Sequence, residues 1–257
     1  MLDNVAEEYV HSKLARINGV NGALLVGSAS LSYADNASDV DLEVLVTKEF
    51  YKKVGTAVEE CESYKGVDIS WEWITLEELE ETLKDWKNDV DLWVYSRARI
   101  LYDPERELEN LLAKYKRYPK KIWREKLFQY WYFATGNAPY DSGKALQRND
   151  LMTGQLYLTQ AMEYYTALIF ILNDHFVPYR KWRFKEFDKL AYKPENYIEN
   201  FKKILTTAGW TRKEFEIKQS IIDNLVTELE KKLNAVGISE EKLKNPWKFK
   251  VPATPKI

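Results

Sequence analysis

Cysteine, histidine and long apolar runs are scarce in this sequence, and each shortage narrows what the chain can be. The single cysteine, Cys61, excludes an internal disulfide, fits a reducing compartment and is expected to be a small core residue. The two histidines, His11 and His175, have no cysteine or carboxylate at the spacing of a metal site. No apolar run reaches the roughly 18 residues that cross a bilayer, and the N-terminal residues lack the features of a signal peptide. We therefore expect a cytoplasmic protein without a membrane partner.

An excess of positive charge is also missing. The 257 residues include 38 Lys and Arg against 40 Asp and Glu, a formal net charge of -2. Proteins that bind long nucleic acids release counterions from them through Lys and Arg, so this balance disfavours nucleic acid as a partner. A local basic patch would escape that average. The same balance is compatible with a small cationic ligand.

The most informative stretch begins with an apolar run that ends at Gly27-Ser28, as expected for a buried strand that enters a turn. Ten residues later an alternating strand begins. Its apolar side chains fall on one face and its acids on the other, namely Asp39, Asp41 and Glu43. Carboxylates at positions i and i+2 repel each other unless a cation neutralises them, and Mg²⁺ prefers such oxygen ligands. A strand whose acids simply face water is the alternative.

Gly27 and Ser28 are candidate binding residues for phosphate, which an acidic strand alone would not bind. A glycine after a strand lets the backbone approach a ligand closely, and a following helix would direct N–H groups toward phosphate. An anion cradle beside a metal-binding strand suits nucleotidyl transfer, in which metal ions activate the acceptor oxygen and stabilise the departing pyrophosphate.

The order hydrophobic-Gly-Ser, ten residues, Asp-hydrophobic-Asp-hydrophobic resembles the signature of the DNA polymerase β-like nucleotidyltransferase superfamily. It is most similar to small members of the aminoglycoside and lincosamide type. The resemblance implies a third metal ligand on a later neighbouring strand, and Asp68 within Val67-Asp68-Ile69 has the matching form. Glu72 shares a face with Asp68 on this second alternating strand, 67–74, which makes it the candidate general base for the acceptor hydroxyl. A residue at the rim of the site is the alternative for Glu72.

A second resemblance lies between residues 172 and 182, where leucine-asparagine, an aromatic residue, proline and lysine-tryptophan follow in order. This order is similar to a stretch of the helical domains that follow antibiotic-type nucleotidyltransferase domains. It implies that Lys181 or Arg180 reaches the triphosphate across an interdomain cleft, since ammonium and guanidinium groups both suit phosphate. Ordinary surface charge fits these two residues equally well.

Strand patterns occur up to residue 103 and only helical patterns follow, which predicts an α+β protein in two parts. Residues 1–103 would form the nucleotidyltransferase domain, a mixed sheet with flanking helices, and residues 104–257 a helical substrate-binding domain built as a bundle. Long helices are predicted over 3–17, from Thr47 to about Cys61, and over 120–135, 144–173, 195–207 and 211–234, with a loop over 137–143.

Two further polar groups in the sequence lie outside the proposed metal and nucleotide sites. Asp89 and Asp91 form another Asp-x-Asp, but they follow no glycine cradle and lie in a helical pattern, so we interpret them as solvated acids at a helix start. The group Arg148-Asn149-Asp150 is a candidate contact for the acceptor.

The predicted function is a metal-dependent nucleotidyltransferase. It would use ATP or another nucleoside triphosphate and two Mg²⁺ ions, with Asp39, Asp41 and Asp68 as ligands and Gly27, Ser28 and Lys181 at the nucleotide. It would transfer a nucleoside monophosphate, AMP in the leading hypothesis, to a hydroxyl of a small molecule. The alternatives are a catalytically silent nucleotide-binding or toxin-antitoxin-type regulator and, third, an RNA nucleotidyltransferase. A homodimer is a candidate assembly.

Overall fold

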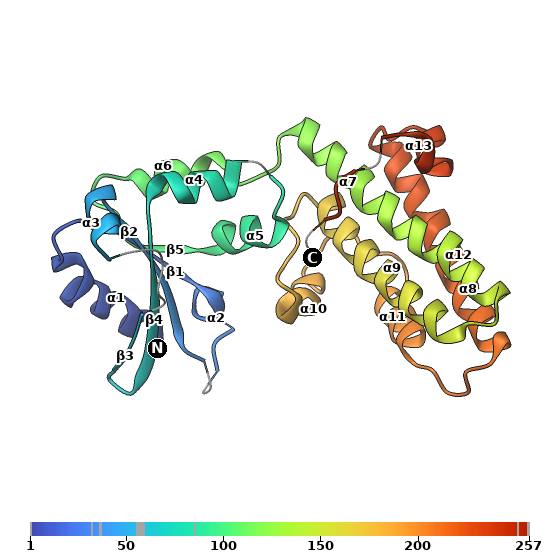
Figure 1. Cartoon of the computed structure of the whole chain (residues 1–257), viewed down its shortest axis with the longest axis horizontal. Coiled ribbons are helices and arrows are strands. Elements are labelled where there is room, and N and C mark those ends of the chain that lie inside the picture. The colour runs from blue at the N-terminus through green and yellow to red at the C-terminus, as the bar shows by residue number, and fades with distance from the viewer. Residues whose placement is uncertain are drawn as a thin grey trace. The chain divides into compact units, whose positions relative to one another are not determined.

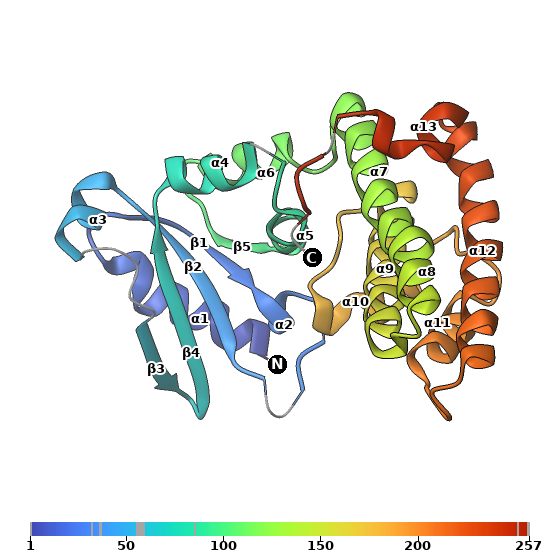
Figure 2. The same cartoon turned by 45° about the vertical axis from the view of Figure 1, so that its right-hand side comes forward.

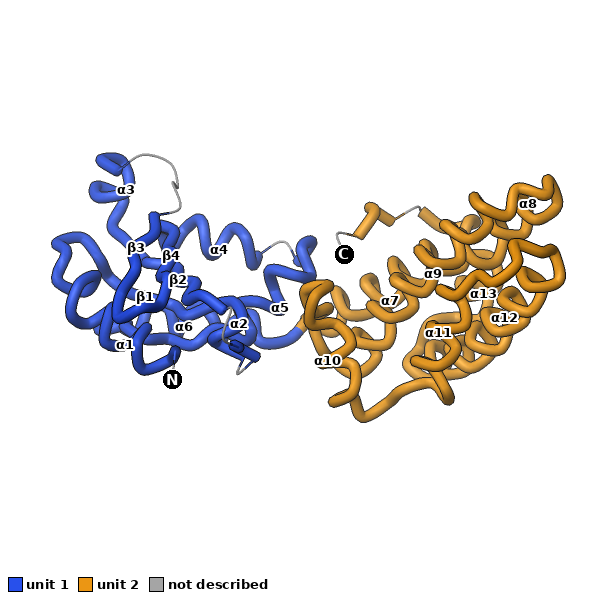
Figure 3. The backbone as a smooth tube through the Cα atoms, turned by 90° about the horizontal axis from the view of Figure 1, so that it is seen from below, with its two compact units in different colours: residues 1–117 blue, residues 118–257 orange. Residues whose placement is uncertain are grey.

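The computed structural model describes residues 2–31, 33–35, 38–54, 60–84, 86–250 and 252–255. The chain divides into two compact units, residues 1–117 and 118–257 (Figure 3). Within the described residues, every strand lies in unit 1 and unit 2 is helical (Figure 1). The architecture is therefore α+β with a helical C-terminal part, as the sequence predicts.

The division falls after Arg117, whereas the sequence pattern placed it after Asp103. Helix α6 (Glu107–Lys114) is the reason, because it packs on the sheet of unit 1. A Cβ atom added to Gly22 would lie only 2.6 Å from Leu108 Cδ1, so the helix and the strand are in close contact. A change from strand to helix patterns marks a change of element, and packing decides where a unit ends.

Unit 1 is built on a mixed five-stranded sheet in the order β3-β4-β2-β1-β5 (Figure 2). Strands β2 and β4 run parallel, and the remaining neighbours are antiparallel. The strands are β1 (Val20–Val26), β2 (Val40–Val46), β3 (Glu60–Tyr64), β4 (Val67–Ile74) and β5 (Arg99–Tyr102). The two alternating strands predicted from the sequence are β2 and β4, and they are neighbours.

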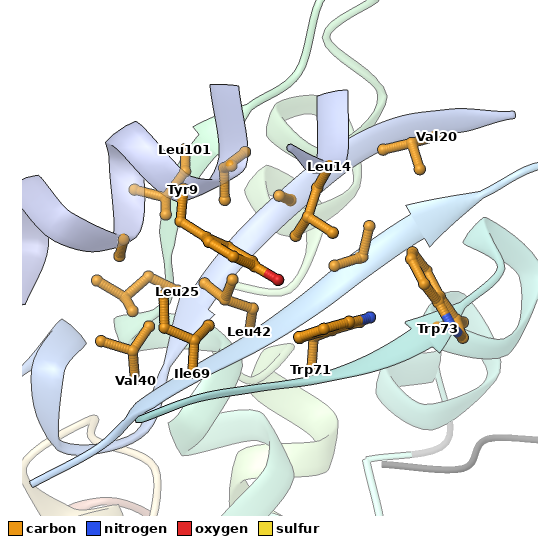
Figure 4. Close-up of a cluster of buried hydrophobic side chains, with 14 of the residues drawn as sticks. Tyr9, Leu14, Val20, Leu25, Val40, Leu42, Ile69, Trp71, Trp73 and Leu101 are labelled. Atoms are coloured by element: carbon orange, nitrogen blue, oxygen red, sulfur yellow. The ribbon is translucent and has the colours of Figure 1, made fainter. Parts of the chain in front are cut away.

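One face of the sheet carries the apolar core of unit 1 (Figure 4). Helix α1 (Leu2–Ser12) and the turn η1 (Leu14–Arg16) cover this face, with Tyr9 and Leu14 fully or almost fully buried. The apolar side chains of the two alternating strands point into it, namely Val40, Leu42, Val44, Ile69, Trp71 and Trp73. Because side chains alternate along a strand, the acids of β2 and β4 are on the opposite face.

Helices α5 (Asp89–Arg97) and α6 pack on the opposite face, and α4 (Leu76–Lys84) contacts both of these helices. Leu108 of α6 contacts Gly22 of β1 there, and the Tyr95 hydroxyl of α5 donates a hydrogen bond to Glu43 of β2. The short helix α2 (Gly27–Ser30) leaves the end of β1.

The helix predicted from Thr47 to Cys61 is much shorter in the structure. Helix α3 (Lys48–Val54) is followed by residues 55–59, which lie outside the described part, and then by edge strand β3. Cys61 lies on this strand and is exposed, so its expected place in the core was wrong. The cause is the hairpin to β4, where Lys65 and Gly66 adopt φ values of 53° and 77°, the two positive values of a type I′ turn.

Unit 2 packs its helices around the long central helix α9 (Leu151–Leu172). The Trp123 indole donates to the Ile171 carbonyl at 2.7 Å, and Thr166 bonds with Tyr197 at 2.8 Å. The other elements are α7 (Lys120–Thr135), η2 (Gly136–Asp141), α8 (Ser142–Gln147), η3 (Arg180–Trp182), α10 (Arg183–Phe187), α11 (Tyr197–Leu205), α12 (Arg212–Ala235), α13 (Glu240–Lys244) and η4 (Pro246–Lys248). None of the described helices is both long and apolar enough to span a membrane.

Two expectations for unit 2 differ from the structure. The loop predicted over 137–143 continues α7 as a turn of π-helix, and the helix predicted over 144–173 is broken between α8 and α9. Asn149 adopts a left-handed φ of 56° at this break, and the Asp150 side chain caps α9 by accepting the Thr153 N–H at 3.1 Å. Asp150 thus has a capping role in the fold, and a contact between the group 148–150 and the acceptor stays a prediction.

Candidate functional site

The turn after β1 touches the acidic strand directly. Gly27 has a left-handed φ of 66°, and a Cβ atom added to it would lie 2.0 Å from Asp41 Oδ2. Any residue with a side chain would be strained there and would displace that carboxylate. Ser28 follows as a buried residue at the start of α2. The structure therefore brings together Gly27, Ser28 and Asp41, three of the residues predicted from the sequence.

The parallel pairing of β2 with β4 places the predicted acids in two adjacent rows. Asp41 is paired with Ser70, whose hydroxyl donates to Asp41 Oδ1 at 3.3 Å, and Glu43 is paired with Glu72. The ladder starts at Val40, which is paired with Ile69; Asp39 and Asp68 are the residues directly before these two, and both acids are exposed. Neighbouring strands in a sheet are about 4.8 Å apart. Asp41 and Asp68 thus lie on one face of two adjoining strands, and Asp39 directly precedes β2.

Adjacent strand positions are not yet a metal centre. Among the described residues, which include all of these acids, no three His, Cys, Asp or Glu side chains are gathered closely enough to hold a metal ion. The structure brings the strands together, but the side chains of Asp39, Asp41 and Asp68 do not converge on one point. Their role as ligands stays a prediction.

Glu43 is the residue of this face to which the sequence assigned no role. Its Oε1 atom accepts a hydrogen bond from the Tyr95 hydroxyl at 3.0 Å, while Oε2 is buried and has no hydrogen-bond partner in the described part of the chain. Burial raises the pKa of Glu43 to about 7, the Tyr95 bond opposes that rise, and the nearby carboxylates Glu72 and Asp91 add to it. Burial, with the Glu43 carboxylate beside it, also raises the pKa of the Tyr95 hydroxyl.

The second Asp-x-Asp, Asp89 and Asp91, lies in the environment of Glu43. Its interpretation as a pair of solvated acids was wrong for Asp89. Asp89 is completely buried, and Asp91 is close enough to Glu43 to affect its pKa. The Asn88 side chain caps α5 and donates to Asp91 Oδ2 at 2.5 Å. One sequence signal could have found this group: Asp91 and Tyr95 are four residues apart, and therefore on one face of a helix.

Lys181, the third predicted nucleotide contact, belongs to unit 2. It is exposed in η3, with Nζ 5.5 Å from the Tyr179 ring centre and 5.6 Å from that of Trp182. Arg180 pairs with Glu163 of α9 at 2.8 Å. These contacts lie within unit 2, and a role for Lys181 at the nucleotide stays a prediction.

Comparisons with known proteins agree with this fold. The sequence model of a family described as a domain of unknown function (DUF4037) matches residues 88–183, from the start of α5 to the start of α10. A crystal structure of a nucleotidyltransferase-like protein from Exiguobacterium sibiricum 255-15 is similar, with a TM-score of 0.56 and 11% sequence identity over 92% of this chain and 78% of that one. No curated protein matches. The chain therefore has a nucleotidyltransferase-like fold.

Proposed function

We propose that this protein is a metal-dependent nucleotidyltransferase that transfers a nucleoside monophosphate to a hydroxyl of a small molecule. The leading candidate for the transferred group is AMP, with ATP as its donor. The contact between Gly27 and Asp41 carries the proposal. Glycine adopts this φ without strain, and its missing side chain lets the β1 turn lie directly against the Asp41 carboxylate, where a phosphate and a metal ion could be bound together. The fold in which this contact occurs is nucleotidyltransferase-like.

Asp39, Asp41 and Asp68 would hold the divalent ions. Carboxylate oxygens are the donors that Mg²⁺ prefers, and the exposed side chains of Asp39 and Asp68 are free to rotate toward Asp41. When bound, two Mg²⁺ ions would neutralise the triphosphate and lower the pKa of the acceptor hydroxyl. Gly27 and Ser28 would bind phosphate through the backbone and the hydroxyl, and Glu72 would accept the proton of the acceptor.

The charge of unit 1 supports an acceptor that carries amino groups, as the resemblance to aminoglycoside-type enzymes implies. Residues 1–117 hold 14 Lys and Arg against 24 Asp and Glu, a net charge of -10. Glu43 of β2, the strand that carries Asp41, is paired with Glu72 of β4, and Asp91 of α5 is near Glu43. Such a face attracts a small cationic acceptor, while the bound divalent ions would offset its repulsion of the triphosphate.

The test is transfer of label from α-³²P-labelled ATP to a panel of hydroxyl-bearing acceptors, with and without amino groups, in the presence of Mg²⁺. We expect pyrophosphate release with the amino compounds and a loss of at least about a hundredfold in Asp41→Asn. Glu81→Gln, an exposed acid of α4, is the matched control and should keep full activity.

Three results would contradict the proposal. Unchanged turnover in Asp41→Asn would remove the proposed site. ATP binding without pyrophosphate release from any acceptor would favour the silent nucleotide-binding alternative. Label found only on added RNA would favour an RNA nucleotidyltransferase.

A further inference from the structure

The near-zero net charge of the chain conceals two units of opposite charge. Residues 118–257 hold 24 Lys and Arg against 16 Asp and Glu, a net charge of +8, whereas unit 1 carries -10. Charge asymmetry between the parts of a chain indicates that the basic part meets a polyanion. The charge of unit 1 therefore disfavours nucleic acid as a partner, whereas the charge of unit 2 favours it.

The basic charge of unit 2 coincides with exposed aromatic rings in one segment, residues 179–185. Four cations fall between residues 179 and 185 and no acid does. Tyr179 and Phe184 are 48% and 44% exposed, although both are large aromatic side chains. We call this the basic–aromatic segment, and its exposed or partly exposed members are Tyr179, Arg180, Lys181, Trp182, Phe184 and Lys185.

Cations and rings alternate in space as well as in sequence. Lys181 Nζ is 5.5 Å from the Tyr179 ring centre and 5.6 Å from that of Trp182, and Lys185 Nζ is 4.7 Å from the Trp182 ring centre. Glu163 pairs with Arg180, but no carboxylate in the described residues pairs with Lys181. Backbone structure holds the segment, because η3 and α10 follow one another directly.

We propose that the basic–aromatic segment is a binding surface for single-stranded nucleic acid. Exposed rings offer a stacking platform for unpaired bases, and lysines interspersed among them reach the phosphates between those bases. A duplex hides its base faces, so rings at this level of exposure fit a single strand better. The binding belongs to unit 2 and stands whether or not unit 1 transfers a nucleotide.

The test uses the full chain and a fluorescein-labelled, unstructured RNA of about 12 nucleotides, followed by fluorescence anisotropy between about 50 and 200 mM salt. Lys181→Gln/Lys185→Gln should weaken binding and lower the slope of log K against log salt by about 1.4, the value for two phosphate contacts on a single strand. The matched control, Lys213→Gln/Lys231→Gln, removes two exposed lysines of α12 and should keep the slope.

Substitutions of Tyr179 distinguish the contribution of base stacking to binding from the contribution of charge. Tyr179→Ala should weaken binding to the single strand about fivefold or more, while Tyr179→Phe keeps the ring and should bind normally. Binding to a duplex of the same sequence should be weaker than to the single strand and unaffected by Tyr179→Ala. Circular dichroism of each variant would show that the helices are intact.

Several results would overturn the inference. The chain would lack the proposed surface if it did not bind the RNA at the lower salt, or if both lysine pairs lowered the slope equally. Equal affinity for phosphatidylserine vesicles, lost in the same variants, would identify an anionic lipid surface instead. A loss of ATP binding in the Lys181 variant with RNA binding intact would assign Lys181 to the nucleotide and refute this use of the segment.

Discussion

Replacing Gly27 with alanine tests whether its contact with Asp41 contributes to the activity or only to the stability of the fold. Two effects are expected. A residue with a side chain at a φ of 66° costs about 1–2 kcal/mol of the free energy of unfolding. The new Cβ would also lie 2.0 Å from Asp41 Oδ2 and 3.0 Å from its Cγ. A carboxylate at the end of a side chain can rotate aside at little cost in free energy. Backbone strain at residue 27 should therefore cause most of the loss of stability, and displacement of the Asp41 carboxylate should cause the loss of activity.

Gly66 provides a matched control for the strain. Its φ is 77°, and a Cβ added to it would meet nothing within 4 Å. We expect Gly27→Ala and Gly66→Ala to lose a similar free energy of unfolding in urea, about 1–2 kcal/mol each. Only Gly27→Ala should lose Mg²⁺-dependent pyrophosphate release, by about a hundredfold, because a misplaced catalytic group of this kind costs that much.

Either of two outcomes would refute this reasoning. Equal activity in the two variants would show that the position of the Asp41 carboxylate against the β1 turn does not matter for turnover. A far greater loss of stability in Gly27→Ala than in Gly66→Ala would show that Asp41 cannot move aside, and the contact would then be structural.

Three further predictions concern buried polar groups. Tyr95→Phe removes the donor to Glu43, so the free energy of unfolding should fall by about 1–3 kcal/mol in urea. In metal-free buffer, stability should also fall as the pH rises from 4.5 toward 7. The folded pKa of Glu43, about 7, lies above its usual 4.5, so the folded chain holds the proton more tightly. This loss amounts to at most about 3 kcal/mol and should vanish in Glu43→Gln. Lys218→Met should cost about 1–3 kcal/mol, because buried Lys218 donates to Gln155 at 2.7 Å and Thr207 at 2.8 Å.

Each of these three has a contrary result. Wild-type stability in Tyr95→Phe would show that another group or water satisfies Glu43. A pH profile shared by the wild type and Glu43→Gln would mean that other groups titrate across that range. Lys203→Met, at an exposed lysine, should change stability little, and a loss as large as that of Lys218→Met would show that burial of Lys218 is not the cause.

Short-range patterns in the sequence were sufficient for the strands that carry the candidate site. Alternation of apolar and acidic residues predicted β2 and β4, and both strands are present with their acids on one face. Gly27 was predicted to lie at a turn after a buried strand, and it does. These features depend on the two-residue period of a strand and on the conformational freedom of glycine, and both are properties of a few neighbouring residues.

Other features depended on which distant residues meet. Glu60–Tyr64 is a strand only because the turn at Gly66 returns it to β4, and α6 belongs to unit 1 only because Leu108 reaches Gly22. The pKa of Glu43 depends on burial under α5 and on Tyr95, which is 52 residues away in sequence.

The sequence by itself therefore determined the elements of the candidate site, two acidic strands and a glycine turn, together with the α+β class. Only the tertiary structure decided that the turn touches Asp41, that Glu43 is enclosed with Tyr95, and that the chain divides into an acidic and a basic unit. The physical reason is that local conformation follows from the residues within a few positions, whereas contact, burial and charge environment arise from segments that the fold brings together.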